Sequence, residues 1–121
     1  MEFKGDKSIF QQIGDSICDR IIKGELNAGD RVESVRELAA MTSVNQNTIL
    51  RTYMELQREN IIQNLRGIGF FVTEDARQKI QKNRIQVFYK EVLPEFLKQV
   101  DLLQISHEEL ILLLKNNNIN K

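Results

Sequence analysis

The first sixty residues carry three stretches with apolar side chains at three- and four-residue steps, the spacing of a helix with one buried face. The first stretch predicts a helix over residues 8–23. Ser8 stands three residues before Gln11, which is the spacing of a capping box at a helix start. The apolar face of this helix consists of Phe10, Ile13, Ile17 and Ile21.

The second stretch predicts a shorter helix over residues 34–41, where Ser34 and Glu37 have the same capping-box spacing. Its core candidates are Leu38, Ala39 and Met41. The third stretch predicts a helix over about 46–59, with Asn45 as its N-cap. Its inward face is Ile49, Tyr53 and Leu56, and its other face is Asn47, Leu50, Arg51 and Met54.

Beyond the third helix the apolar period changes, and residues 61–64 and 69–73 predict two short strands. The turn between them contains Gly67, which adopts positive φ without strain. Helical spacing returns from Asp75 in a long helix, which Pro94 is expected to kink or end. One side of this long helix carries Ala76, Ile80, Val87, Phe88, Val92 and Phe96.

A last helix is expected from Ser106 to about Lys115, because Ser106 and Glu109 form a third capping-box pair. It contains five consecutive apolar residues, 110–114. A helix that is apolar on all sides needs cover on all sides. A short helix pair cannot bury this surface within itself, so a second protomer is the simplest source of cover.

Composition narrows the class of protein. The chain has 121 residues, 41% of them hydrophobic, and its 17 Lys+Arg balance its 17 Asp+Glu. These values indicate one domain, or one small domain with an appendage. No run approaches the ~18 apolar residues of a membrane span. Together they favour a soluble, cytoplasmic protein with no membrane partner.

The residues that carry metal and catalytic chemistry are scarce. One cysteine, Cys18, and one histidine, His107, are too few for a structural zinc site, which takes about four such ligands. The sequence has no clustered nucleophile and base and no phosphate-cradling glycine loop. We therefore expect no metal, no cofactor and no enzymatic activity. We interpret Cys18 as a buried small residue and His107 as a surface residue.

The order helix, short helix, turn, helix, hairpin indicates a winged helix-turn-helix domain, mostly α with a small β-hairpin. In such domains the N-terminal residues of the second motif helix meet base edges in the major groove. Asn45, Gln46, Asn47 and Thr48 occupy that place in this sequence. Asn and Gln pair with adenine, and Thr reaches phosphate or a thymine methyl.

These segments resemble the DNA-binding domain of the GntR family of regulators, without a gap over about 9–73. Glu33 stands where the family usually has proline, which puts the rigidity of that turn in doubt and adds a negative charge. Asn60 stands where the family usually has glycine, and Asn tolerates the left-handed conformation. The segments that carry the resemblance are Gly24-Glu25-Leu26, Ala28-Gly29-Asp30-Arg31, Ser34-Val35-Arg36-Glu37-Leu38-Ala39, Val44-Asn45-Gln46-Asn47-Thr48, Tyr53-Met54-Glu55-Leu56 and Arg66-Gly67-Ile68-Gly69-Phe70-Phe71-Val72.

The resemblance implies a DNA-binding site. Leu50 lies where the family often has a polar reader, so we expect an apolar contact with a thymine methyl there. Arg51 is expected to reach the DNA backbone, and the wing tip at Arg66 and Gly67 to enter or flank the minor groove. The implied DNA-contacting residues are Arg36, Asn45, Gln46, Asn47, Thr48, Leu50, Arg51, Arg66 and Gly67.

Members of the family differ in the segment C-terminal to the winged domain. The organisation implied here is a DNA-binding domain over 1–73 and a helical arm over 74–121, which leaves 121 − 73 = 48 residues for the arm. That is similar to the YtrA subfamily, in which a short helical arm serves dimerisation. The residues expected at the dimer seam are Phe88, Val92, Phe96, Leu110, Leu113 and Leu114.

Simpler roles stand beside the DNA contacts. Asn45 serves equally well as a helix cap alone, and Arg36 as an ion-pair partner of Glu33 or Glu37. Arg51 has Glu55 four residues on as a surface partner. The Phe88 and Phe96 series also fits the wall of a small ligand pocket, although nothing in the sequence indicates an effector. Arg66 also fits as an ordinary turn residue.

The function implied by the resemblance is a homodimeric transcriptional regulator, most simply a repressor, on a roughly palindromic double-stranded DNA operator. Control of an ABC-transporter operon is the regulation that the subfamily suggests. The alternative is a winged-helix module for protein–protein contacts, which the zero net charge keeps open. All six basic residues between 24 and 78 are arginines, a side chain suited to directional contacts with phosphate and guanine. We therefore expect weak non-specific affinity and tight binding only by two protomers on a matched site.

Overall fold

The computed structural model describes residues 7–117. The chain forms two compact units, Met1–Asn83 and Arg84–Lys121, and each is described by itself. In the described residues no helix is both long and apolar enough to cross a membrane. We call the first unit the winged unit and the second the arm.

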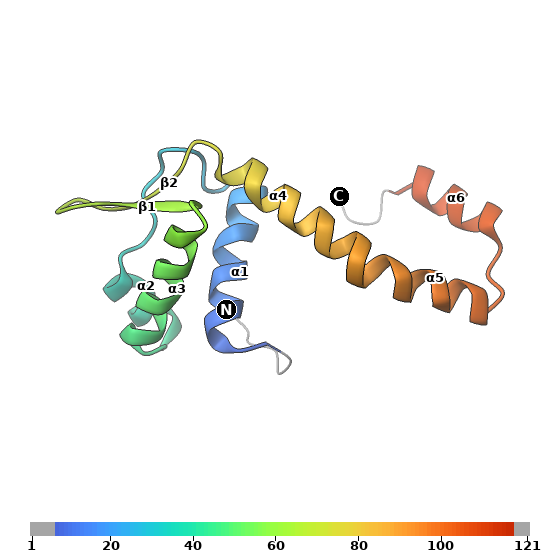
Figure 1. Cartoon of the computed structure of the whole chain (residues 1–121), viewed down its shortest axis with the longest axis horizontal. Helices are drawn as coiled ribbons and strands as arrows, with labels where there is room; N and C mark the ends of the chain where they lie inside the picture. Colours follow the sequence, from blue (N-terminus) through green and yellow to red (C-terminus); the bar gives the residue numbers. More distant parts are fainter. Residues whose placement is uncertain (1–6, 118–121) are drawn as a thin grey trace. The chain divides into compact units, whose positions relative to one another are not determined.

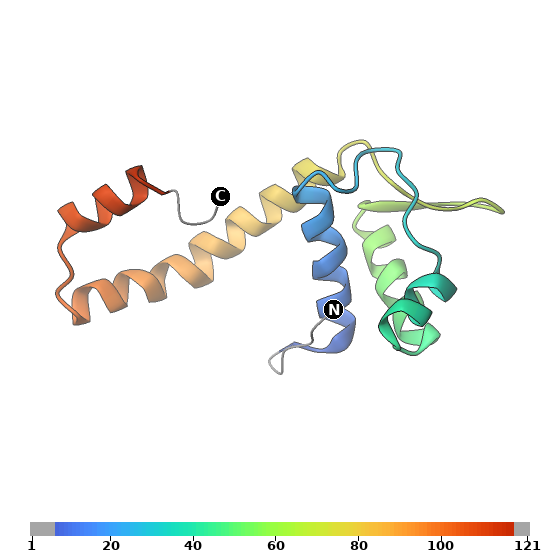
Figure 2. The same cartoon turned by 180° about the vertical axis from the view of Figure 1, so that it is seen from behind.

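The winged unit has three helices, a hairpin and the start of a fourth helix (Figure 1). Seen from both sides, α1 and α3 run next to each other, and the hairpin projects away from them (Figures 1 and 2). The elements are α1 (Ile9–Ile22), α2 (Val35–Thr42), α3 (Gln46–Arg58), β1 (Ile62–Leu65), β2 (Gly69–Val72) and α4 (Ala76–Val87).

Helix α1 begins where the sequence predicts. Ser8 caps it in both directions: the Gln11 backbone N–H donates to Ser8 Oγ at 3.1 Å, and the Ser8 N–H donates to Gln11 Oε1 at 3.4 Å. Its predicted apolar face is confirmed for Ile13, Ile17 and Ile21, which are buried, whereas Phe10 is half-buried. Cys18 is buried beside them, as expected for a small packing residue.

Helix α2 also begins with a complete capping box, between Ser34 and Glu37. Leu38 and Ala39 are buried as predicted, but the core assignment of Met41 is wrong, because 70% of its surface is exposed. The buried face of this two-turn helix is centred between Leu38 and Ala39. Met41 lies on the opposite side of that helix from Ala39.

Helix α3 is the centre of the winged unit and packs against α1, α2 and β1. Its predicted inward face is confirmed, with Ile49 and Tyr53 fully buried. Thr52 is buried as well, and its hydroxyl donates to the carbonyls of Thr48 and Phe10. After α3 the chain reverses at Asn60, which takes the left-handed conformation with φ 61°.

The hairpin is antiparallel, with Ile62 opposite Val72 and Leu65 opposite Gly69. The first strand begins and ends one residue later than predicted, and the second strand ends one residue earlier. The loop before α2 pairs with the outer edge of β2, where the Val32 N–H donates to the Phe70 carbonyl at 2.9 Å. This pairing joins the wing to the core beneath it.

The first turns of α4 complete the core of the winged unit. Ala76 is fully buried and Ile80 is 3% exposed, and both belong to the same apolar cluster as α1 and α3. The helix begins after Thr73, whose hydroxyl donates to the Asn60 carbonyl at 2.7 Å. The unit therefore includes residues beyond the hairpin.

The arm continues from the end of α4 through a π-helical turn, η1 (Phe88–Val92), into α5 (Leu93–Leu102). The Leu93 N–H donates to the Phe88 carbonyl, which closes the wide turn. Pro94 does not end the helical path, because η1 continues directly into α5 and Pro94 lies in the first turn of α5. A left-handed residue, Gln104 with φ 52°, follows α5.

The last helix, α6 (His107–Lys115), follows a loop after α5 and runs back toward the start of α5 (Figure 1). Ser106 caps it by accepting the Glu109 N–H at 3.3 Å. The return bond from the Glu109 side chain is not formed, so the predicted capping box is only half present. His107 is exposed, as expected.

Candidate DNA-binding surface

The first turn of α3 presents polar side chains at the surface of the winged unit. Asn45 is the N-cap, and its Oδ1 accepts the Asn47 N–H at 2.7 Å. The capping role is therefore confirmed. Gln46 and Asn47 are exposed, and Thr48 is half-buried. This turn holds the hydrogen-bonding groups that read bases, together with the partial positive charge of a helix N-terminus.

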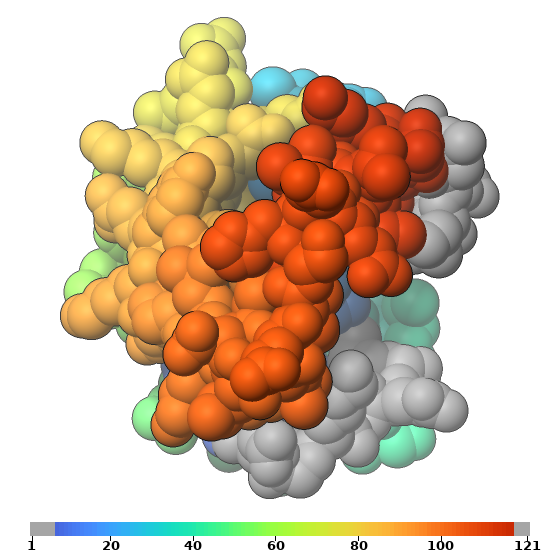
Figure 3. All heavy atoms as spheres, turned by 90° about the vertical axis from the view of Figure 1, so that its right-hand side faces the viewer, coloured from blue at the N-terminus to red at the C-terminus, as the bar shows by residue number. Residues whose placement is uncertain are grey.

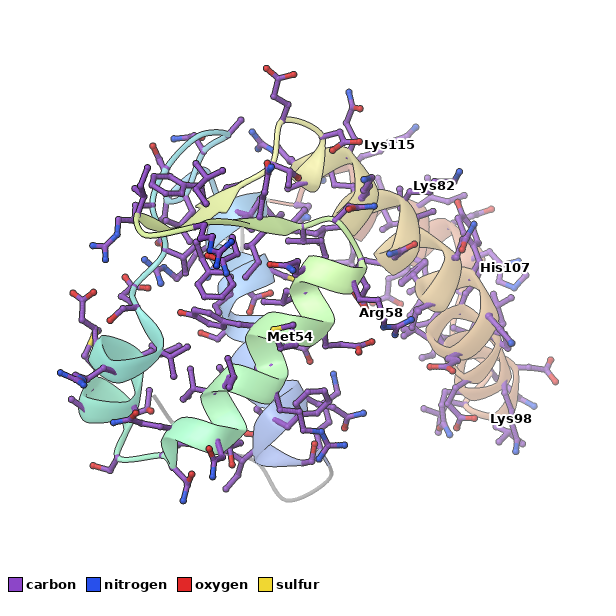
Figure 4. The ribbon with its side chains drawn as sticks, turned by 60° about the vertical axis from the view of Figure 1, so that its left-hand side comes forward. Met54, Arg58, Lys82, Lys98, His107 and Lys115 are labelled. Atoms are coloured by element: carbon purple, nitrogen blue, oxygen red, sulfur yellow. The ribbon has the colours of Figure 1, made fainter. Side chains whose placement is uncertain are left out.

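The remainder of the outward face of α3 is less polar. Leu50 is 44% exposed and Met54, labelled midway along α3 in Figure 4, is 50% exposed. The sequence placed both on this face, but it assigned no contact to Met54. With Asn47 they form a ridge at three- and four-residue steps, which we call the α3 ridge.

The two arginines of α3 already have partners. Arg51 lies over the ring of Phe10 on α1, with 4.6 Å from its guanidinium carbon to the ring centroid. The alternative ion pair between Arg51 and Glu55 does not form, because Glu55 pairs with Arg58 one turn along the helix. That pair holds the pKa of Glu55 below its ordinary value and raises the pKa of Arg58.

Arg36 is exposed in the first turn of α2, and within residues 7–117 its side chain has no ion pair or hydrogen bond. The expected pairs of Arg36 with Glu33 or Glu37 do not form. Glu33 pairs with Arg20, and Glu37 lies 3.7 Å from Arg31. The Arg36 guanidinium is therefore open to an external anion.

Glu33 replaces the family's usual proline, and its charge is compensated locally. Both of its carboxylate oxygens accept from Arg20 on α1, at 2.7 and 3.0 Å. The bond from Arg20 lowers the pKa of Glu33. The Glu33 carbonyl also accepts the Tyr53 hydroxyl at 2.6 Å. The turn is held by these contacts to α1 and α3 instead of by a proline ring.

The tip of the wing is a short exposed turn. Gly67 has φ 79°, which a residue with a Cβ rarely adopts, and Arg66 beside it has no partner within the described residues. Directly after this turn, at the start of β2, a Cβ on Gly69 would lie 2.9 Å from Arg31 Nε, so Gly69 makes room for the Arg31 side chain. Sequence reasoning missed this packing of Arg31, for which a glycine in the facing strand is the only signal.

The arm exposes apolar side chains from η1 to α6. Figure 3 shows the side of the molecule on which α5 (orange) and α6 (red) lie. Leu110 is half-buried, and Val100 is the one fully buried apolar residue of the arm among the described residues. The other residues predicted at the dimer seam are Phe88 (46% exposed), Val92 (50%), Phe96 (46%), Leu113 (55%) and Leu114 (75%).

A capped helix with a polar first turn, a supporting two-turn helix and an antiparallel wing with an exposed arginine define a winged helix-turn-helix protein. The chain belongs to the bacterial regulatory proteins of the gntR family, whose family model matches residues 9–72. It is thus a DNA-binding transcriptional regulator. The relatives that share its sequence are named as regulators of transcription and not as enzymes.

Two relatives come from Bacillus subtilis. The uncharacterised HTH-type transcriptional regulator YhcF is 41% identical over 110 residues, 91% of this chain and 89% of YhcF. The HTH-type transcriptional repressor YtrA is 36% identical over 92 residues, 76% of this chain and 67% of YtrA. A solved structure of a GntR-family regulator from Listeria monocytogenes is 36% identical, with a TM-score of 0.74 over 93% of this chain and 97% of that one.

Proposed function

We propose that the protein is a homodimeric repressor that binds a roughly palindromic operator. Each protomer places α3 in a major groove, with half-site centres about one helical turn, ~34 Å, apart. The name of YtrA as a repressor supports the direction of regulation. An operator bound by such a dimer blocks polymerase without any further activity of the protein.

The proposed contacts divide by chemistry. Asn45, Gln46, Asn47 and Thr48 meet base edges and phosphates at the start of α3. Arg51 leaves Phe10 or extends past it to reach the backbone, and Leu50 meets a thymine methyl. Arg36, Arg66 and Gly67 contact the DNA from α2 and from the wing tip.

The observation that best supports this proposal is that two arginines of the predicted site form no ion pair within the described part of the winged unit. Arg36 and Arg66 have no acidic partner among the described residues, whereas Arg20, Arg31 and Arg58 each have one. A Lys or Arg side chain that neutralises a phosphate releases a counterion from the DNA, and a cation already paired with a carboxylate is less available for this contact. The net charge of zero therefore does not exclude DNA binding, because two arginines of the predicted site, Arg36 and Arg66, are not neutralised by an acidic side chain of residues 7–117.

The proposed dimer seam is the apolar surface of the arm. Its half-exposed aromatic and aliphatic residues would cost free energy in water, and an exposed patch of this kind marks an interaction site. The occupant we propose is the arm of a second copy, with Phe88, Val92, Phe96, Leu110, Leu113 and Leu114 in the contact.

The test is binding of the purified protein to duplexes from the region upstream of its own gene, followed by fluorescence anisotropy over a series of salt concentrations. We expect affinity to fall as salt rises, with a slope set by the number of phosphate contacts. Arg36→Ala and Arg66→Ala should weaken binding and reduce that slope by about one per protomer contact removed.

The matched control is Lys98→Ala, which removes one exposed positive charge from α5 (Lys98 is labelled in Figure 4). It should leave both affinity and slope unchanged. Equal affinity of wild type, Arg36→Ala and Arg66→Ala would overturn the site assignment. Absence of salt-dependent binding to any such duplex would favour the protein–protein module instead.

We further propose that the regulated genes include its own operon and that this operon encodes an ABC transporter. The support is the likeness of the short helical arm to the YtrA subfamily. Transcript levels of the neighbouring genes, measured with and without the regulator, test this directly. Unchanged levels across the operon would exclude the proposal.

A further inference from the structure

We propose that α3 reads an A·T-rich half-site, and that the apolar part of the α3 ridge, Leu50 and Met54, reads it through thymine methyl groups. This inference rests on the proposed function, because it requires α3 to enter a major groove. It adds the chemical identity of the bases that are read.

The first observation is the exposure of two large apolar side chains on a helix that has a well-packed opposite face. Leu50 is 44% exposed and Met54 50%, and neither belongs to the apolar core of the winged unit. They stand four residues apart, so their side chains are neighbours along the helix surface. Figure 4 shows Met54 midway along α3, with Arg58 nearer its end.

The second observation is that both cations of α3 contact another side chain of the winged unit. Its two basic residues are Arg51 and Arg58. Arg51 is stacked on Phe10, and Arg58 is paired with Glu55. The commonest specific contact to guanine is a two-pronged one from Arg or Lys. The described surface of α3 thus presents no arginine or lysine that is unengaged and ready to read G·C pairs in this way.

The available free arginines do not change this conclusion. In the proposed complex Arg36 contacts the DNA from α2, the helix that crosses the backbone in this motif, and Arg66 contacts it from the wing tip. The base-reading groups left on α3 are the amides of Gln46 and Asn47, the hydroxyl of Thr48 and the apolar side chains of the α3 ridge. Amides pair with adenine at its N6 and N7 atoms.

Thymine supplies the complementary apolar group. Its C5-methyl is the apolar group on the major-groove edges of the four base pairs, and apolar side chains recognise it by contact. In the major groove, an A·T pair therefore presents adenine N6 and N7 to an amide side chain and the thymine methyl to an apolar side chain. Asn47 and Leu50, three residues apart, match those two partners on one face of α3.

The experiment begins with selection of duplexes from a random-core pool by the full-length protein. The selected duplex is then synthesised with uracil in place of each thymine in turn, which removes the methyl and keeps the base pairing. We expect A·T-rich half-sites, and about fourfold weaker binding for each contacted methyl that is removed. Binding is measured by fluorescence anisotropy at one salt concentration.

Variants connect the loss to the two side chains. Leu50→Ala and Met54→Ala should each bind thymine and uracil duplexes equally at one position, since the side chain that senses the methyl is gone. Both sites are exposed and alanine favours helices, so these variants are expected to fold. Met41→Ala, which truncates a 70% exposed methionine on α2, should keep the full discrimination of the wild type.

The outcomes separate the two proposals. A selected site that the wild type binds equally well with thymine or uracil would overturn the methyl readout and leave the DNA-binding function intact. Selected half-sites rich in G·C under α3 would do the same. Failure to enrich any sequence would overturn the proposed function itself.

Discussion

The helices of the winged unit and of the arm have a similar apolar periodicity, but they differ in how far their apolar side chains are buried. Among the described residues, every fully buried apolar side chain except Val100 lies in the winged unit. The helices of the arm keep their aromatic and aliphatic residues about half exposed. A helical pattern therefore predicts an apolar face, but not whether the same chain supplies the surface that covers it.

The polar groups show the same contrast. In the winged unit, tertiary hydrogen bonds connect elements that are distant in the sequence, such as Tyr53 to Glu33 and Arg77 to the Ile22 carbonyl. In the arm, a side-chain hydrogen bond such as that from Gln99 to Glu95 stays within one helix. We expect the winged unit to derive its stability from within, and the arm to derive its own from association.

The largest expected effect comes from charging the arm. Phe96→Asp should convert the dimer to a monomer, because the dimer would bury an unpaired carboxylate. We expect the dissociation constant of the dimer to rise more than about a hundredfold. Sedimentation velocity measures this, and circular dichroism should show that the helices of the winged unit persist.

Lys98→Ala, two residues further along the same helix, is the control and should stay dimeric. A wild-type protein that sediments as a monomer at all concentrations would contradict the proposed seam. Unchanged association of Phe96→Asp would place the seam elsewhere on the chain.

The next effect concerns the core. Ile49→Ala removes three carbons from a fully buried side chain on α3 and should lower the free energy of unfolding by about 3 kcal/mol. Met54→Ala, on the exposed side of the same helix, should change it by less than about 0.5 kcal/mol. Urea unfolding at a fixed protein concentration provides both values. Similar losses for the two variants would remove the distinction between the faces of α3.

A smaller loss of stability is expected when one buried hydroxyl group is removed. Tyr53→Phe leaves the Glu33 carbonyl without its donor, and we expect a loss of about 1.5 kcal/mol in the free energy of unfolding. Tyr89→Phe is the matched change on the arm, where the tyrosine is 63% exposed, and should have almost no effect. Thermal unfolding of the two variants side by side tests whether the hydrogen bond, and not the residue type, matters.

The smallest effect depends on pH. Because Arg20 lowers the pKa of Glu33 in the folded protein, the pair stabilises the fold above the ordinary pKa of glutamate. Glu33→Gln should cost about 1 kcal/mol at neutral pH. The difference from wild type should shrink once the pH falls below about 4.3 and vanish below the lowered pKa.

Urea unfolding across this pH range is the measurement. Glu74→Gln, an exposed carboxylate with no partner among the described residues, should follow the wild type at every pH. A gap between Glu33→Gln and wild type that does not change with pH would show that the ion pair does not stabilise the turn.

Local signals predicted much of the fold. Ser8, Ser34, Asn45 and Ser106 all cap helices as expected, because capping depends on residues two or three positions apart. Met41 was misplaced because a two-turn helix has too few residues to define its buried face, and contacts with α3 decide it.

The electrostatic partners could not be predicted in the same way. Sequence spacing offered Glu55 to Arg51, yet Arg51 lies over Phe10, 51 − 10 = 41 positions away. Glu33 was expected to add a negative charge near the DNA-binding side. Its pairing with Arg20 could not be predicted, because it depends on α1 lying next to the loop that precedes α2. The candidate site was predicted as a set of residues, but which of its cations are free is a tertiary property.

The π-helical turn of the arm has a consequence for the phase of its helix. A four-residue repeat such as Phe88, Val92 and Phe96 advances by about 40° at each step on an ordinary α-helix, since 3.6 residues complete a turn. The wider turn of η1 takes up one extra residue and cancels part of that rotation. In evolutionary terms it acts as a single-residue insertion that keeps an apolar stripe straight, so a deletion there would misalign the stripe while leaving every apolar residue in place.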